Sequence, residues 1–378
     1  MPTLPIPTLH AVAPELVTLA DHAQAAHAQL DAHAWAYFSG GAADEITLRA
    51  NRSAWDKLLL HPRVLRCLAG GHTRTELLGR TLAHPILLAP VAFQRLAHPD
   101  GELATAYAAA AQGAGLVLST QASTPLEDVA QAIRNNPGRG PLWFQLYWQH
   151  DRGFTRQLVE RAEAAGYEAL VLTVDAPSSG ARDRERRAGF RLPAGISAVN
   201  LAGLPPPPPL APGQSPLWDG LLRHAPTWDD VAALQALTRL PVLLKGVLHP
   251  EDARQAAALG VAGVIVSNHG GRTLDTSPST ASVLPRIADA VGSSLPLLVD
   301  GGIRRGTDVL KALGLGARAV LIGRPVVYGL ANAGAAGVAH VLRLLRDELE
   351  IAMALTGCAT LADAPGALGA APAPGGLP

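Results

Sequence analysis

The chain has 378 residues, with 31 basic and 31 acidic side chains and a mean hydropathy of +0.17. The balanced charge argues against a protein that binds nucleic acid, because such proteins carry a clustered basic excess. The two cysteines, Cys67 and Cys358, are too few for a disulfide framework and show no C-x-x-C spacing typical of zinc, so we expect no metal site.

The N-terminal segment, residues 1–16, has no basic region, and prolines interrupt its apolar residues, so it does not resemble a signal peptide. Apolar runs elsewhere are far shorter than the ~20 residues that a membrane-spanning helix needs. We therefore expect a cytoplasmic protein without a membrane segment.

Short apolar runs recur along the chain and do not alternate with polar residues. Such runs are typical of strands buried on both faces, as in a parallel sheet. The eight runs are 85–90, 115–120, 142–147, 168–175, 240–246, 262–268, 295–302 and 317–323. Segments with helical patterns lie between them, at 102–112, 125–133, 153–165, 227–237, 251–259 and 305–313.

Eight strand–helix units in succession predict an α/β fold of the (β/α)8 TIM-barrel class. The doubly wound alternative is weaker, because no G-x-G-x-x-G motif follows the first strand. We expect the barrel to span 81–361, with a closing helix over 334–361, after an N-terminal helical extension over 1–80. The tail, 362–378, has a low-complexity composition that predicts disorder.

A long insertion, 176–239, separates the fourth and fifth predicted strands. Loops of this length are usually active-site lids or disordered segments. Its first part, 181–190, is highly charged, whereas its proline-rich part, 204–214, is expected to be extended and mobile.

The residues at the carboxyl ends of the predicted strands are mostly polar. Any one of them could be an ordinary buried polar group, but in barrels the active site lies where these ends converge. They are Ala89, Pro90, Ser119, Thr120, Gln121, Gln145, Tyr147, Thr173, Asp175, Lys245, Ser267, Asn268, His269, Asp300, Gly323 and Arg324.

Two glycine–arginine segments, 300–308 (DGGIRRGTD) and 323–326 (GRPV), follow the seventh and eighth strands. Glycines let backbone N–H groups approach an anion, and an arginine can pair with it. Barrels often bind phosphate at this place. The alternative is two turns with solvated arginines.

The segment 266–272 (VSNHGGR) places His269 and Arg272 just beyond the sixth strand. A histidine beside an arginine needs a carboxylate to remain a useful base, and Asp300 on the next strand is a candidate. Together they suit an anionic substrate with a removable proton. Lys245 could stabilise negative charge on a cofactor.

Several longer motifs, YFSGGAADEITLRAN, TVDAP, LLKGV, VSNHGGR, DGGIRRGTDVLKAL and IGRPVVYGL, resemble the FMN-dependent 2-hydroxy-acid oxidase and dehydrogenase family, which includes glycolate oxidase, lactate oxidase and mandelate dehydrogenase. The resemblance runs from about residue 14 to 361. It implies a barrel that binds FMN and oxidises an L-2-hydroxy acid to a 2-oxo acid.

The resemblance also assigns roles to single positions. It implies that His269 is the catalytic base, Asp300 the carboxylate that orients it, and Asp175 a residue that supports the site. The substrate would be held by Tyr37, Tyr147, Arg182 and Arg272. FMN would contact Ala89, Pro90, Val91, Ala92, Ser119, Gln145, Thr173, Lys245, Ser267 and Asp300, and its phosphate Gly302, Arg304, Gly323 and Arg324.

In the implied reaction His269 takes a proton, either from the α-carbon or from the hydroxyl with hydride passing to the flavin. Lactate and glycolate are the first candidates, because Phe93 and Trp143 could narrow the mouth of the barrel. Both residues could equally be ordinary packing residues. Two positions leave the nature of the substrate side-chain pocket undetermined. Relatives have an aromatic residue where this chain has Gln121, and the lid over 176–227 contains no tyrosine.

We expect O₂ to be the electron acceptor, giving H₂O₂, because the chain has no haem domain and no apparent membrane segment. The alternatives are a dehydrogenase that passes electrons to a quinone, a catalytically silent flavin-binding protein, and another FMN-barrel chemistry such as diphosphate isomerisation. The last leaves His269, Arg272 and Arg182 without a role. Relatives suggest a homo-oligomer, a tetramer or larger.

Overall fold

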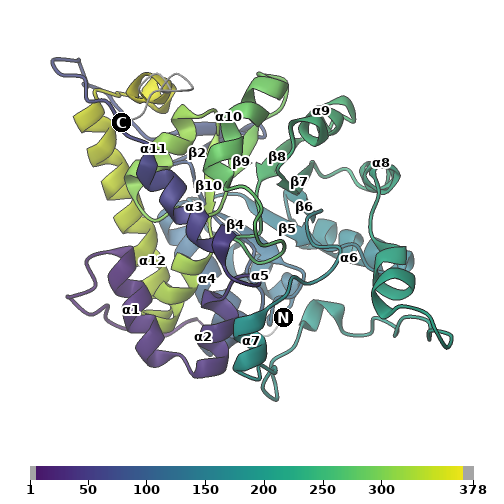
Figure 1. Cartoon of the computed structure of the whole chain (residues 1–378). Coiled ribbons are helices and arrows are strands. Elements are labelled where there is room, and N and C mark those ends of the chain that lie inside the picture. Colours follow the sequence, from purple (N-terminus) through teal and green to yellow (C-terminus); the bar gives the residue numbers. More distant parts are fainter. Residues whose placement is uncertain (1–5, 369–378) are drawn as a thin grey trace.

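The structure, a computed structural model, describes residues 6–368 and contains a closed barrel of eight parallel strands (Figure 1). Every predicted strand is present, and the barrel closes where Val320 of the last strand pairs with Ile86 of the first. The barrel strands are β3 (Ile86–Leu88), β4 (Gly115–Ser119), β5 (Leu142–Leu146), β6 (Ala169–Thr173), β7 (Val242–Val247), β8 (Gly263–Val266), β9 (Leu297–Val299) and β10 (Ala319–Ile322).

The strand residues divide between two apolar cores because successive side chains point to opposite faces of a strand. One set packs outward against the helices, and the other fills the barrel interior around Val117, Trp143 and Ile265. Trp143 is 2% exposed in this interior core. It is therefore a packing residue and does not narrow the mouth of the barrel.

The helices that follow the strands form the outer layer. All six predicted helices are present within one or two residues. An additional helix, α10, was not predicted, because Pro285 interrupts its pattern. The outer helices are α4 (Gly101–Gln112), α5 (Leu126–Ile133), α6 (Arg152–Ala165), α8 (Trp228–Leu237), α9 (Pro250–Ala258), α10 (Thr280–Val291) and α11 (Gly306–Gly314).

The closing helix, α12 (Arg324–Thr356), begins earlier than predicted and consists of two segments that meet at a kink at Ala333 and Gly334. Gly334 has a φ of 55°, which glycine adopts readily. By length and composition α12 could cross a membrane, but 72% of its most apolar window is buried within the fold. A core helix of a water-soluble protein passes the same test.

The N-terminal extension is not helical throughout. Helices α1 (Leu19–Gln29), α2 (Ala32–Ser39) and α3 (Ile46–Lys57) are followed by a hairpin of β1 (Thr75–Leu77) and β2 (Arg80–Leu82). Leu77 and Leu82 of the hairpin join the interior core of the barrel. The predicted boundary at residue 80 therefore cuts through a hairpin that packs on the barrel.

The prediction of disorder from residue 362 is wrong for the first part of the tail. A 3₁₀ helix, η5 (Leu361–Ala367), buries Ala364 and Ala367, and Leu368 forms a bridge with Leu60. These small apolar side chains pack on the fold despite the low-complexity composition. Residues 369–378 lie outside the described part of the chain.

The lid insertion leaves β6, forms the short helix α7 (Asp183–Arg187) beside α2, and then follows the periphery to α8 (Figure 1). Arg184 of α7 donates a 3.0 Å hydrogen bond to Ser39 of α2 and also pairs with Glu45. The charged part of the lid is thus attached to the N-terminal extension.

Candidate active site

A cleft with an empty volume of about 1050 Å³, open space included, lies at the carboxyl ends of the barrel strands. It brings together nearly every residue that the sequence predicts for the site. Its lining includes Tyr37, Ala89, Pro90, Val91, Ala92, Ser119, Gln121, Gln145, Tyr147, Thr173, Arg182, Lys245, His269, Arg272, Asp300, Gly302, Arg304, Gly323 and Arg324. Ser267 lies behind the lining and accepts a hydrogen bond from Lys245 Nζ at 2.9 Å.

The carboxylate beside His269 is Asp175, not Asp300 as predicted. Asp175 Oδ1 lies 3.0 Å from His269 Nδ1, whereas Asp300 Oδ2 pairs with Lys245 Nζ at 3.1 Å. Gly246 makes the space for Asp175, because a Cβ atom at residue 246 would lie 2.4 Å from the Cβ of Asp175. Strand order alone does not reveal which way a side chain turns beyond the strand end.

The environment of His269 favours its neutral, proton-accepting form. Burial lowers its pKa below the usual value, Asp175 opposes this, and Lys245 and Arg272 lower it further. Tyr147 Oη lies 3.4 Å from the other ring nitrogen, Nε2. Burial raises the pKa of Tyr147, with Asp175 adding to the effect, so its hydroxyl stays protonated and can donate a hydrogen bond.

Arg182 and Arg272 lie together at the lid side of the cleft. Arg182 Nε donates to the backbone oxygen of Arg272 at 2.7 Å, and Arg272 donates to the backbone oxygens of Tyr37 and Gly40. The Arg272 guanidinium also lies over the Tyr37 ring, 5.0 Å from its centroid. A planar guanidinium held in this way can bind a carboxylate through two parallel hydrogen bonds.

Two lid residues at the site were not identified from the sequence. Glu185 accepts hydrogen bonds from both arginines, and Phe190 stacks on Tyr37 with ring centroids 4.9 Å apart. The alternation of acidic and basic residues over 181–187 gives no signal that distinguishes Glu185 from its neighbours. Its contacts are visible only once the lid is placed on the barrel.

Side chains from the ends of β4, β5 and β6 form a polar wall of the cleft. Gln145 accepts a hydrogen bond from Thr120 N at 3.1 Å and donates to Thr173 Oγ1 at 3.1 Å, and Ser119 contacts the same amide. Asp300 Oδ1 is buried and has no hydrogen-bond partner among residues 6–368. A bound group that donates a hydrogen bond at this place would satisfy the oxygen.

Two partly buried arginines, Arg304 and Arg324, lie at the end of the cleft next to β9 and β10. Arg324 donates to the backbone oxygens of Phe38, Gly270 and Gly40, and Arg304 donates to that of Ile303. Within the described chain neither guanidinium forms an ion pair. Burial, together with nearby arginines, lowers the pKa of Arg324 to about 9, so an anion would stabilise its charge.

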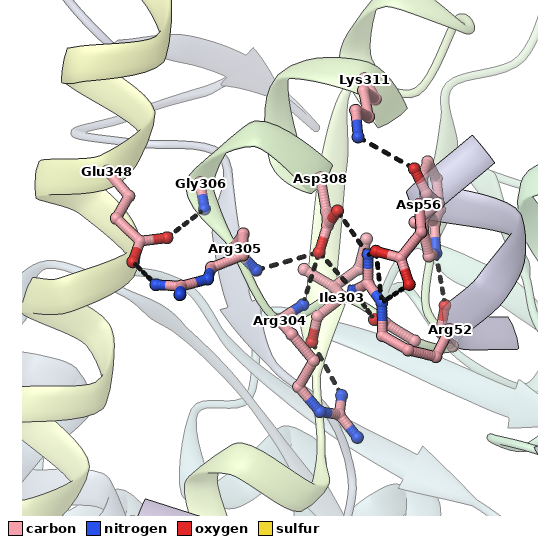
Figure 2. A network of polar contacts seen from close by, with 12 residues as sticks. Arg52, Asp56, Ile303, Arg304, Arg305, Gly306, Asp308, Lys311 and Glu348 are labelled. Carbon is pink, nitrogen blue, oxygen red and sulfur yellow. Dashed lines mark hydrogen bonds and ion pairs between the residues drawn. The ribbon is translucent and has the colours of Figure 1, made fainter. Parts of the chain in front are cut away.

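The backbone beside these arginines is held by a network of polar contacts (Figure 2). Asp308 accepts hydrogen bonds from the backbone N–H groups of Arg304 and Arg305, each at 2.9 Å, and pairs with Arg52 of α3 at 2.6 Å. Glu348 of α12 pairs with Arg305. The loop is thus fixed from two sides, which leaves the Arg304 side chain to face the cleft.

These features fit FMN. Arg304, Arg324 and the glycines at 301, 302 and 323 can hold the phosphate, since the glycines leave backbone N–H groups accessible and the arginines need an anion. Lys245, Gln145 and the unpartnered Asp300 oxygen can meet the polar edge of the ring, and the backbone of 89–92 can cover its face.

Comparisons with known proteins identify the family of the chain. Residues 26–368 match the family model of FMN-dependent dehydrogenases. The chain is 53% identical to an L-lactate oxidase of Alicycliphilus denitrificans over 91% of this chain and 93% of the relative. It is 46% identical to glycolate oxidase 1 of Zea mays over 92% and 94% of the two chains.

The fold agrees as well. A crystal structure of mandelate oxidase with (S)-2-phenylpropionate superposes with a TM-score of 0.82, at 44% identity, covering 92% of this chain and 96% of that one. The barrel is therefore shared with this enzyme. The chain belongs to the FMN-dependent dehydrogenase family.

Proposed function

We propose that the protein oxidises a small L-2-hydroxy acid, with L-lactate as the first candidate, to the 2-oxo acid, with FMN as cofactor and O₂ as electron acceptor. The observation that carries this proposal is the convergence of the His269–Asp175 pair and the Arg182–Arg272 pair on one cleft. The first pair suits removal of a proton, and the second suits binding of a carboxylate. The L-lactate oxidase and glycolate oxidase relatives support the same reaction class.

The protein's own side chains supply positioning and proton transfer. Arg182 and Arg272 bind the substrate carboxylate. The Tyr147 hydroxyl, which lies beside His269 Nε2, donates a hydrogen bond to the substrate. His269 accepts a proton at Nε2 while Asp175 holds Nδ1 and stabilises the imidazolium that forms. FMN, when bound, accepts the two electrons of the oxidation. Fixing the substrate in this geometry lowers the barrier by several kcal/mol.

The side-chain pocket supports a small substrate. Gln121, Val91 and Phe38 line the cleft. The lid residue Phe190 stacks on Tyr37 and adds aromatic bulk on that side. This lining is compatible with the small side chains of lactate and glycolate, which are the first candidates.

The test is anaerobic addition of L-lactate, glycolate and L-mandelate to the purified holoenzyme while flavin absorbance is followed. Loss of the yellow absorbance identifies a substrate, with D-lactate as the control that must leave it unchanged. Readmitted air then restores the absorbance rapidly in an oxidase and slowly in a dehydrogenase. A flavin that no 2-hydroxy acid reduces would contradict the proposal and indicate a silent flavoprotein.

We also propose that the protein forms a homo-oligomer. In support, Val64 and Leu65 are 79% and 102% exposed, and Leu355 at the end of α12 is 69% exposed. The segment around Arg63 packs against Gly357, next to that helix end, so these apolar side chains belong to one region. Light scattering coupled to size exclusion measures the mass, and a monomer would contradict the proposal.

A further inference from the structure

The two arginines assigned to the substrate carboxylate already share a carboxylate of the protein. Glu185 Oε1 lies 3.0 Å from Arg182 Nη1 and 3.1 Å from Arg272 Nη2. The three side chains are only 14–18% exposed. Glu185 lies on α7, the short helix of the lid. It does not line the cleft itself, but both guanidinium groups that it contacts belong to residues of the lining.

Glu185 is not needed to hold the arginines in place. Arg272 is fixed by the backbone oxygens of Tyr37 and Gly40 and by the Tyr37 ring. Arg182 is fixed by the backbone oxygen of Arg272. The effect of Glu185 is therefore mainly electrostatic, because it cancels one of two like charges in a poorly solvated place.

We infer that Glu185 is the built-in counter-ion of the Arg182–Arg272 pair and competes with the carboxylate of substrate and product for these two guanidinium groups. The inference rests on the proposed function, since it takes the arginines as the carboxylate site. With Glu185 present, an incoming carboxylate meets a net charge of about one instead of two. The 2-oxo acid product is consequently held less tightly and leaves more readily.

This role concerns binding and release, not the chemical step. Substrate and product both carry the carboxylate, so Glu185 weakens their binding to a similar extent. Removing its charge should lower KM without raising kcat, and kcat should fall if product release becomes limiting. If Glu185 merely positioned the arginines, the result would be the opposite, because loss of a positioning residue raises KM.

The experiment measures the affinity of the oxidised holoenzyme for pyruvate and glyoxylate by calorimetry or by the change in flavin absorbance. For E185Q we expect the Kd to fall on the order of tenfold, because one opposing charge near the bound anion is lost. E185A removes the same charge without introducing a side-chain amide, and it should also lower the Kd. The FMN content should equal that of the parent protein.

D183N is the matched control. Asp183 lies on the same helix and undergoes the same change in charge, but it pairs with Arg186 and Arg187 and is 32% exposed. It should leave the Kd unchanged. An unchanged or higher Kd in both Glu185 variants would overturn the inference, as would equal tightening by D183N.

The inference and the proposed function fail in different ways. If 2-hydroxy acids reduce the flavin but the Glu185 variants bind 2-oxo acids no more tightly, only the inference is wrong. If the parent neither binds a 2-oxo acid nor is reduced by any 2-hydroxy acid, the proposed function is wrong and the inference falls with it.

Discussion

The chemistry of the site depends on how two buried carboxylates are distributed between two bases. Asp175 faces His269, and Asp300 faces Lys245. The first pair keeps a neutral imidazole oriented for proton transfer, and the second keeps an ammonium charged at the place where the flavin would carry negative charge. In accord with this, Asp300 and Asp175 raise the pKa of Lys245 against the effect of burial.

Substitution D175N should alter both the rate and its pH dependence. His269 must be neutral to accept a proton, so activity falls as pH drops through its pKa, which lies below the usual 6.5. Asp175 raises that pKa, so its loss moves the acid limb of kcat/KM to lower pH. The plateau should fall at least about tenfold, since a weaker base is left without its orienting partner. Steady-state rates from pH 4 to 8 measure both effects.

An acid limb that stays at the parent's pH in D175N would contradict the assignment of Asp175. Retention of FMN, measured by absorbance, is the control that the variant is folded.

At the residue scale, the sequence predicted the position of nearly every side chain in the cleft. The rule that barrel sites gather at strand ends sufficed for Lys245, His269 and Gln145. It could not assign the partner of His269, because that depends on the space that Gly246 leaves for Asp175. Nor could it predict Glu185, whose role depends on how α7 docks.

At the scale of elements, the loop proposed to bind phosphate, 300–308, is positioned by helices from both ends of the chain. Arg52 of α3 donates to the backbone oxygen of Gly302 and pairs with Asp308, and Glu348 of α12 accepts from Gly306 N (Figure 2). The motif predicted an anion site from its glycines and arginines alone. Its dependence on α3 could not be predicted, because Arg52 and Asp308 are 256 residues apart.

Substitution D308N should weaken FMN binding although Asp308 does not line the cleft. Asp308 is 1% exposed, and an amide would lose the ion pair with Arg52 and one acceptor oxygen for the loop. We expect the Kd for FMN to rise on the order of tenfold, equivalent to about 1.4 kcal/mol. Titration of the apoprotein with FMN, followed by flavin fluorescence, measures it.

D347N is the control for this prediction, because Asp347 makes only an exposed pair with Arg343 on α12. If D308N lowers the melting temperature but leaves the Kd for FMN at the parent value, the contacts of Asp308 serve stability and not cofactor binding.

At the scale of the whole molecule, the sequence predicted the fold more completely than the way its ends pack. All eight strands followed from apolar runs, because a parallel barrel buries both faces of each strand. The hairpin of β1 and β2 was not predicted, because three-residue strands give a weak sequence pattern. The 3₁₀ helix η5 was not predicted, because its small apolar residues also give a weak pattern. The kink in α12 was not predicted, because nothing in the sequence distinguishes Gly334 from Gly329 and Gly337 in the same alanine-rich helix.

FMN should stabilise the whole barrel, because its site joins the N-terminal extension, β9, β10 and the start of α12. At a free concentration one hundred times its Kd, the cofactor adds about 2.7 kcal/mol to the free energy of unfolding. For a chain of this length that raises the melting temperature by about 3 °C. Calorimetry of the apoprotein with and without FMN tests this, and an unchanged melting temperature would show that the cofactor does not bind the folded state.

The most direct test of the central claim compares the parent and H269Q by anaerobic mixing with L-lactate, or with whichever 2-hydroxy acid reduces the parent. The glutamine keeps a polar side chain of similar size but cannot accept the proton as a base. We predict that H269Q retains FMN and that its rate of flavin reduction falls by about 10²- to 10⁴-fold. Reduction of the H269Q flavin at the parent's rate would contradict the assignment of His269 as the base and the mechanism built on it.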